Sequence, residues 1–211
     1  MRARSASESL KAETYKYLAG TAPYRGDDRA SVFQKKTDDI RKLVEDVADR
    51  TIGIDAKKRE LPAVSDVNSY AELRVRGQAH DYYRPKSTEM KSRATMFRST
   101  EIVLIFAAAA LSAVTAASDG PAWAAWIPVV TTISAAVAAE AAVQRYSALA
   151  VEYARTNREL DRLLRDRTGG DGGSQPSDDD RFVENAERVI SLQNEAWMAR
   201  GVAAAKAGFK G

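Results

Sequence analysis

The sequence predicts an all-α membrane protein: a two-transmembrane helical hairpin with long cytoplasmic helical extensions that pack into a bundle. Two runs without a charged residue, 102–118 and 121–139, follow each other with only Asp119-Gly120 between them. Outside these runs, apolar residues recur at intervals of three and four, which is typical of helices with one buried face. No stretch alternates apolar and polar residues for long enough to predict a strand.

The two runs are just long enough to cross a bilayer. At about 1.5 Å per residue they extend roughly 25 and 28 Å, slightly less than the ~30 Å hydrocarbon core, so flanking side chains must snorkel or the bilayer must thin. Gly120-Pro121 combines a helix stop with a helix start, and Trp123 and Trp126 lie near that turn, where an aromatic belt is expected. The alternative is a soluble hairpin buried in a larger helical protein, because seventeen apolar residues are at the edge of the spanning range.

The basic residues predict the orientation of the hairpin. They flank both spans on their outer sides, whereas the connecting turn carries none, so both termini are expected in the cytoplasm. These residues are Arg84, Lys86, Lys91, Arg93 and Arg98 before the first span and Arg145, Arg155 and Arg158 after the second.

Composition excludes several classes of function. The 32 Lys and Arg residues barely exceed the 29 Asp and Glu residues and gather beside the spans, which favours the lipid bilayer as a partner and argues against nucleic acid. The chain has no cysteine, which excludes disulfides and thiolate chemistry, and its one histidine, His80, excludes a multi-histidine metal site. Without a phosphate-binding loop or carboxylates paired with a nucleophile, we expect no enzymatic activity, no cofactor and no metal.

Residues that start and break helices predict the domain organisation of the chain. Helices are expected over about 7–19 and 28–52, a kink near 82–84 because of Pro85, and an unbroken continuation of the second span as far as Arg167. The predicted segments are an N-terminal cytoplasmic helical unit (1–62), a long-helix hairpin containing both spans (63–167), a flexible linker (168–180) and a C-terminal cytoplasmic helix that packs on the stalks (181–211).

A few polar groups and one proline within the spans are candidates for lining or gating a pore. Glu140 is either a carboxylate inside the membrane or an interfacial residue paired with Arg98 or Arg145. The proline is expected to bend the second span, and the bend serves either a gate or the structure alone. The hydroxyls either line a narrow aqueous path or bond to their own backbone. The candidates are Thr115, Pro128, Thr131, Thr132, Ser134 and Glu140.

Small residues at four-residue steps in both spans allow close helix approach. The spacing alone leaves open whether they join the hairpin to itself or to neighbouring copies. The first series is Ala108, Ser112 and Ala116, and the second is Ser134, Ala138 and Ala142.

Cations and aromatic rings are mixed on the segment before the first span. Arg74, Gln78, Tyr82 and Lys86 are candidate contacts for a phosphate-bearing ligand or signal, through charge-assisted hydrogen bonds and stacking. A solvated helix face explains them as well, because alternate residues of one helix cannot all face one ligand.

Two parts of the sequence resemble a known family. The stretch YAELRVRGQAHDYYRPK (70–86), followed by two short spans and by QNEAW (193–197), resembles the SLATT domains of prokaryotic conflict systems. LKAETY (10–15) and APYRGD (22–27) resemble a segment that precedes this domain in some members. The chain departs from the family where Tyr82-Tyr83 replaces an expected tryptophan-tyrosine pair.

The resemblance implies an effector in the bacterial inner membrane that forms a pore or perturbs the membrane when infection is signalled. No sensor domain is recognisable in the sequence, so the signal is expected from a separate sensor protein or from a nucleotide bound to the cytoplasmic helices. Two helices cannot enclose a pore, and a homo-oligomer is therefore required. The alternative is a non-conducting anchor or scaffold that recruits a cytoplasmic partner.

Overall fold

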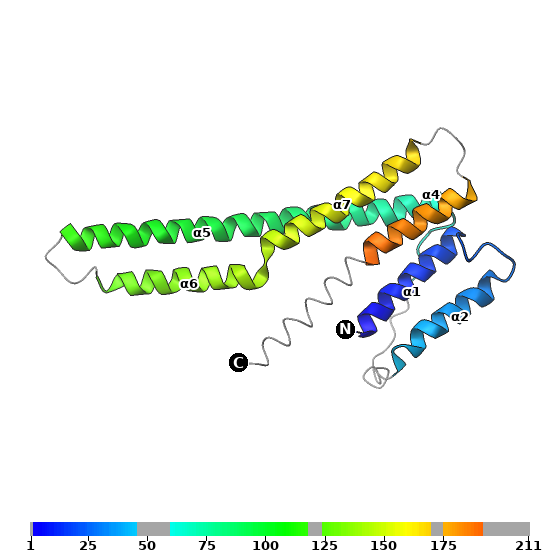
Figure 1. The fold of residues 1–211 in the computed structure, drawn as a ribbon, viewed down its shortest axis with the longest axis horizontal. Helices are drawn as coiled ribbons and strands as arrows, with labels where there is room; N and C mark the ends of the chain where they lie inside the picture. The colour runs from blue at the N-terminus through cyan, green and yellow to red at the C-terminus, as the bar shows by residue number, and fades with distance from the viewer. Residues whose placement is uncertain (1, 46–59, 118–123, 170–174, 192–211) are drawn as a thin grey trace. The chain divides into compact units, whose positions relative to one another are not determined.

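The computed structural model describes residues 2–45, 60–117, 124–169 and 175–191. Every regular element among these residues is a helix, which confirms the all-α prediction (Figure 1). The chain divides into two compact units. We name them the bundle unit, Met1–Asp81 with Thr156–Gly211, and the hairpin unit, Tyr82–Arg155.

The bundle unit begins with two antiparallel helices, α1 (Arg2–Ala19) and α2 (Arg29–Lys42) (Figure 1). Gly20, with a φ of +66°, ends α1 in the left-handed conformation that glycine adopts without strain. Tyr24 in the connection is fully buried, and its hydroxyl donates a hydrogen bond to the Glu13 carboxylate. The rings of Tyr17, Tyr24 and Phe33 pack against one another, with centroids 4.6–6.0 Å apart, and fix α2 against α1.

The short helix α4 (Val67–Tyr70) returns the chain to α1. Its N-terminus has a capping box: the Ser69 amide donates to Asp66 Oδ1 at 2.7 Å and the Asp66 amide donates to Ser69 Oγ at 3.0 Å. The unit is completed by the distal part of α7 (Tyr146–Thr168) and by a helix over 176–191.

The sequence places the start of the last helix at Arg181, whereas the structure begins it at residue 176. Asp178 and Asp179 therefore belong to its first turn, where acidic side chains interact favourably with the free amides of the helix N-terminus, and Asp180 follows directly. The second predicted helix, 28–52, corresponds to α2, which ends at Lys42. Residues 46–59 and 192–211, with the rest of those two predictions, lie outside the described residues.

A π-helix, η2 (Ala71–Tyr83), follows α4. In a π-helix each amide bonds to the carbonyl five residues earlier, so the turn is wider than the 3.6 residues of an α-helix. The buried residues here fit this wider turn, because each but the last is followed by another one four or five residues along the chain. They are Tyr70, Ala71, Arg74, Val75, Ala79 and Tyr83. The change from π to α geometry comes at Arg84, directly before Pro85, where the sequence predicts a kink.

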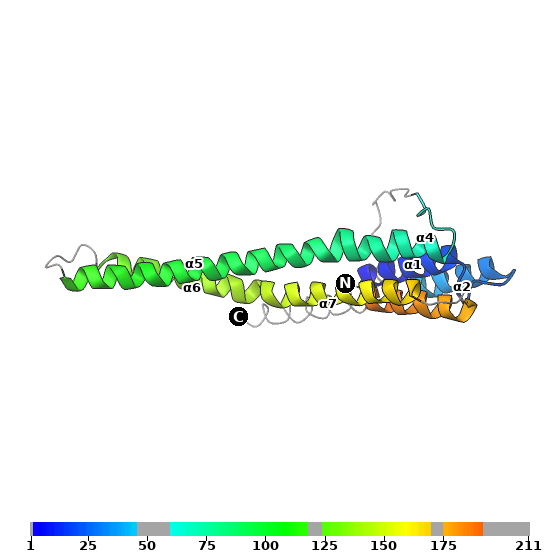
Figure 2. The same cartoon turned by 90° about the horizontal axis from the view of Figure 1, so that it is seen from above.

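The hairpin unit contains α5 (Arg84–Ala117), α6 (Trp126–Gln144) and the proximal part of α7. Helices α5 and α6 lie side by side in both views (Figures 1 and 2). Each contains an apolar stretch long enough to cross a membrane, and none of that stretch is buried inside the structure. The predicted turn around Asp119-Gly120 and Trp123 lie outside the described residues.

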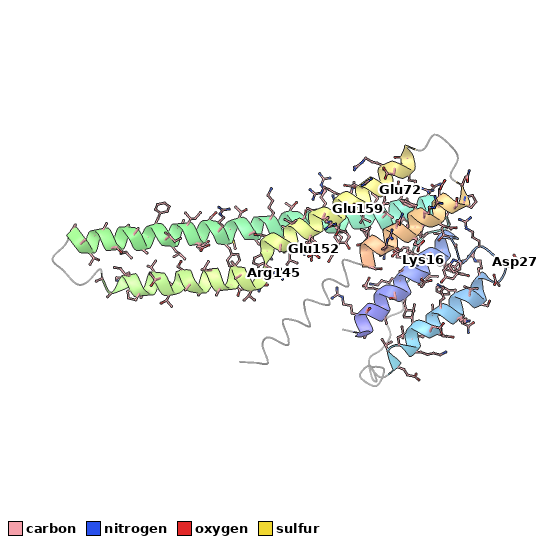
Figure 3. The ribbon with its side chains drawn as sticks, viewed as in Figure 1. Lys16, Asp27, Glu72, Arg145, Glu152 and Glu159 are labelled. Atoms are coloured by element: carbon pink, nitrogen blue, oxygen red, sulfur yellow. The ribbon has the colours of Figure 1, made fainter. Side chains whose placement is uncertain are left out.

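The second long helix is interrupted where the sequence predicts an unbroken one. Helix α6 ends at Gln144, α7 begins at Tyr146, and Arg145 between them has φ 50° and ψ 37°. This left-handed conformation costs a non-glycine residue about 1–2 kcal/mol. Figure 3 labels Arg145 at this junction. The Tyr146 ring stacks on Phe97 of α5, with centroids 5.3 Å apart, so tertiary packing holds the start of α7 in place.

The predicted bend at Pro128 has no basis in the structure. The sequence starts the second span at Pro121, which places Pro128 in the helix interior. The structure instead has residues 124–125 in a turn and begins α6 at Trp126. Pro128 therefore lies in the first turn, where its missing amide hydrogen breaks no intrahelical bond.

Candidate functional site

The two apolar helices face each other along a narrow seam. Within 102–117 and 126–144 the seam residues are half-buried, whereas the other apolar residues are exposed. The seam residues recur at three- and four-residue steps, as in coiled-coil packing. They are Leu104, Ala107, Ala108, Leu111 and Thr115 of α5, and Ile127, Val130, Ser134, Val137, Ala138 and Ala141 of α6.

Beside the seam, one face of the hairpin carries mainly small residues. Each α-helical residue turns by about 100°, and the two helices run antiparallel, so positions that follow a seam residue by one fall on the same face in both. We name this the small face. Its exposed members are Ala109, Ser112 and Ala116 of α5 and Pro128, Thr131, Ala135, Ala139 and Ala142 of α6, with one larger residue, Ile105 of α5, beside them.

The opposite face carries large apolar residues and is named the large face. Its members Val103 and Val114 on α5 and Trp126 and Ile133 on α6 are 65, 45, 58 and 48% exposed. A contiguous patch of exposed large apolar side chains is rare on the surface of a soluble monomer and usual on a surface that meets lipid or another protein. The hairpin therefore has two chemically different faces.

The candidate pore residues do not fall on one face. Thr115 and Ser134 are in the seam, Thr131 and Pro128 are on the small face, and Thr132 is exposed on the outer edge of α6. Of the small residues, Ala108 and Ala138 are in the seam, while Ser112, Ala116 and Ala142 are on the small face. The two helices thus use only part of each small-residue series to pack against each other.

Glu140 is exposed near the end of α6, and its Oε1 accepts a hydrogen bond from the Gln144 amide at 2.8 Å. The partner is thus a residue one turn away rather than Arg98 or Arg145. Hydroxyls in both spans are also bonded within their own helices, as Thr115 and Thr132 show. Thr115 donates to Leu111 O at 2.8 Å, and Thr132 donates to Pro128 O at 2.7 Å.

The bundle unit contains a buried ion pair between segments far apart in the sequence. Arg74 Nε and Nη2 donate to Glu187 Oε1 and Oε2, both at 3.0 Å, and the side chains are only 7% and 3% exposed. The Tyr70 hydroxyl donates to the same Oε1 at 3.0 Å. The Tyr15 ring of α1 lies 4.4 Å from the Arg74 guanidinium carbon. Three parts of the chain, α1, α4–η2 and the helix over 176–191, therefore meet at this charge.

Arg74 is buried in this ion pair, whereas the sequence predicts that it contacts a ligand. Burial by itself lowers the pKa of Arg74, but the hydrogen bonds and charge of Glu187 outweigh it and raise that pKa. The guanidinium is thus ionised and committed to a carboxylate of the same chain. Among the other predicted contacts, Gln78 is half-buried, Tyr82 is 43% exposed, and Lys86 is paired with Glu89 at 2.8 Å.

Sequence reasoning missed Glu187 and Tyr15. A signal for Glu187 exists: it lies among Val183, Ala186 and Ile190, on the buried face of its helix. A carboxylate in that position needs a buried cation or proton. The sequence does not indicate which of its many cations is the partner, because the pairing depends on tertiary packing.

The buried Tyr70 hydroxyl is expected to make the protein less stable at alkaline pH. Burial, and then the charge of Glu187, raise the pKa of Tyr70 well above its usual value of 10.0. A raised pKa contributes stability below the unfolded value and loses it as pH rises, because only the unfolded chain releases the proton. We expect the urea midpoint of the protein to fall between about pH 9 and pH 11, and Tyr70→Phe to weaken that dependence. An equal pH dependence in Tyr70→Phe contradicts the assignment.

A comparison with protein families finds a match over residues 70–197, more than half of the chain, to SMODS and SLOG-associating 2TM effector domain 1. The match begins at Tyr70, so α1 and α2 precede it. No curated protein and no solved structure matches the chain. The two apolar helices of the hairpin unit are the two transmembrane segments in this description.

Proposed function

The chain belongs to the SMODS and SLOG-associating 2TM effector domain (SLATT) family, and from this membership we propose that it is a pore-forming defence effector of the bacterial inner membrane. In this proposal several copies assemble and open a path through the bilayer. Activation leads to growth arrest or death of an infected cell.

The observation that carries the proposal is the difference between the two faces of the hairpin. The large face suits lipid along most of its length, because its valine, isoleucine and tryptophan side chains offer no polar group except the Trp126 indole. Its one carboxylate among the described residues, Glu140, lies near the end of α6. The small face, with Ser112 and Thr131 among alanines, suits close contact with other copies of the chain around a central axis. An assembly with small faces inward places the hydroxyl-bearing residues where a path must form.

The bundle unit supports a role in receiving the signal. The excess of basic residues on the outer sides of both spans favours a cytoplasmic location for this unit and for both termini. A nucleotide or a separate sensor protein would act there. A change in the bundle unit reaches the hairpin unit along η2–α5 and α7, which belong to both.

A second function has an observation of its own. The hydroxyls of Thr115, Thr131 and Thr132 are bonded to carbonyls of their own helices, which satisfies their donors without water. Such a hairpin is suited to a non-conducting anchor that holds a cytoplasmic partner at the membrane.

Two neighbouring alanines of α6 provide a test with a matched control. Ala135→Phe adds volume on the small face, and Ala136→Phe adds the same volume about 100° away, on the outer edge of the helix. Overpacking a close contact costs roughly 1–3 kcal/mol, so Ala135→Phe is expected to reduce the assembled mass in detergent and the ion flux from loaded liposomes. Ala136→Phe should leave both close to the wild-type values, because lipid chains accommodate the ring.

Two outcomes separate the two functions. Assembly with flux that is lost only in Ala135→Phe supports a pore built on the small face. A wild-type protein that stays monomeric and passes no ions, with or without an extract of phage-infected cells, overturns the pore and favours the anchor.

A further inference from the structure

A groove of about 600 Å³ lies within the hairpin unit, between the first turns of α5 and the proximal part of α7. Its walls include Ala94 of α5 and Ala150 and Ala154 of α7. Methyl groups at these positions are too small to fill the space between the helices, so room for a ligand remains. Two cations, Lys91 and Arg98, line the same groove.

These two cations differ from their neighbours on α5. Lys86 and Arg93 each form an ion pair with Glu89, at 2.8 and 3.1 Å. In the part of the chain that the structure describes, no carboxylate lies within ion-pair distance of Lys91 or Arg98. They are seven residues apart, which places them on one side of the helix, one above the other. The groove therefore presents two unneutralised positive charges to whatever occupies it.

The groove lies next to the apolar stretch. Arg98 is four residues before Ile102, where the uncharged run begins, so its Cα lies roughly 6 Å below that point along the helix. A lipid head-group layer is about 5–8 Å thick on each side of the hydrocarbon core. Arg98 is thus at the level of lipid phosphates. Lys91 lies two turns further away, with a side chain long enough to extend back toward this layer.

We propose that this groove binds the head group of an anionic phospholipid. The Arg98 guanidinium contacts the phosphodiester, for which its planar fork is well shaped, and the Lys91 ammonium supplies a second charge deeper in the groove. Ser147, at the rim on α7, offers a hydroxyl to the same phosphate. The acyl chains remain in the bilayer beside α5 and α6. This lipid site does not depend on whether the protein conducts.

The test compares two lipids that differ only in head-group charge. The full chain, purified in an uncharged detergent, is mixed with equal amounts of phosphatidylglycerol and phosphatidylcholine that have identical acyl chains, and bound lipid is counted by native mass spectrometry. A basic residue near a membrane surface contributes about fivefold to anionic binding. The preference for phosphatidylglycerol is expected to fall about twenty-five-fold in Lys91→Gln/Arg98→Gln.

Three controls make the result specific to the groove. Lys86→Gln/Arg93→Gln removes two charges from the same helix outside the groove and should keep the preference. Ala94→Leu/Ala150→Leu fills the groove without changing charge and should lose it, which also covers the case in which the Lys91 and Arg98 variant does not fold. Soluble glycerol 3-phosphate should fail to displace the lipid.

The proposal is overturned if Lys91→Gln/Arg98→Gln keeps the wild-type preference, or if Lys86→Gln/Arg93→Gln loses as much, since charge near the membrane would then act without a site. Displacement by glycerol 3-phosphate at concentrations comparable to the lipid overturns the lipid assignment, because the groove would then bind a free phosphate ester.

Discussion

Replacing Glu187 with alanine is expected to destabilise the bundle unit by about 3–5 kcal/mol. The Arg74 side chain, which is 7% exposed in the intact ion pair, loses its carboxylate, and a buried charge without a partner is costly. The Tyr70 hydroxyl loses its acceptor at the same time. The opening free energy of the helix over 176–191, measured by hydrogen exchange on the full chain in detergent, reports this loss directly.

Two further variants identify the cause. Asp178→Ala removes the carboxylate of an exposed pair with Arg181 on the same helix and should cost less than about 1 kcal/mol. Arg74→Met/Glu187→Leu removes both charges and should recover most of the stability, because a buried ion pair replaced by apolar residues is often neutral. If Glu187→Ala behaves like Asp178→Ala, the pair contributes little and the helix is held by its apolar contacts alone.

Glu187 also connects the domain that matches the family to the preceding segment, which contains α1 and α2. The guanidinium that it binds lies against Tyr15 of α1. The same helix carries Asp180 near its N-terminus, and the Asp180 carboxylate pairs with Arg25 at 2.7 Å. The backbone amide of Ala22 donates to the same carboxylate at 2.7 Å. Loss of the ion pair should therefore increase exchange in α1 as well as in the helix over 176–191.

Replacing Ile133 with lysine is expected to reduce membrane insertion of the second apolar helix by about 2.5–3.5 kcal/mol. Ile133 is 48% exposed on the large face, so the ammonium would face lipid rather than the seam. The surrounding alanines contribute little insertion energy, and the helix has little apolar surplus to offset a charge. Alkaline carbonate extraction of membranes measures the retained fraction, which should fall by at least tenfold.

Val143→Lys is the matched control for depth. Val143 is also exposed on α6 but lies at its last turn, from which a lysine can extend to the lipid head groups at small cost. Equal retention of Ile133→Lys and Val143→Lys would mean that α6 does not cross the hydrocarbon core, and would favour the soluble hairpin.

Much of the fold follows from the sequence because its signals are local. Uncharged length predicts the two apolar helices, and three- and four-residue spacing predicts α1 and α2. Other features depend on distant contacts. The wide turn of η2 is hidden because thirteen residues sample too few turns to distinguish its period from 3.6. The break at Arg145 is hidden because arginine has no preference for a left-handed backbone, and the Phe97–Tyr146 stack holds the start of α7 beside it.

The sequence by itself determined the class of the protein: all-α, with a two-span apolar hairpin and a resemblance to the family that the comparison confirms. Hydrophobic length and helical period are properties of contiguous residues, so no partner is needed to recognise them. Only the tertiary structure decided which small residues pack within the hairpin and which stay exposed, and that Arg74 is paired with Glu187. These features depend on how segments as far apart as 113 positions approach each other, and local residue patterns do not encode that pairing.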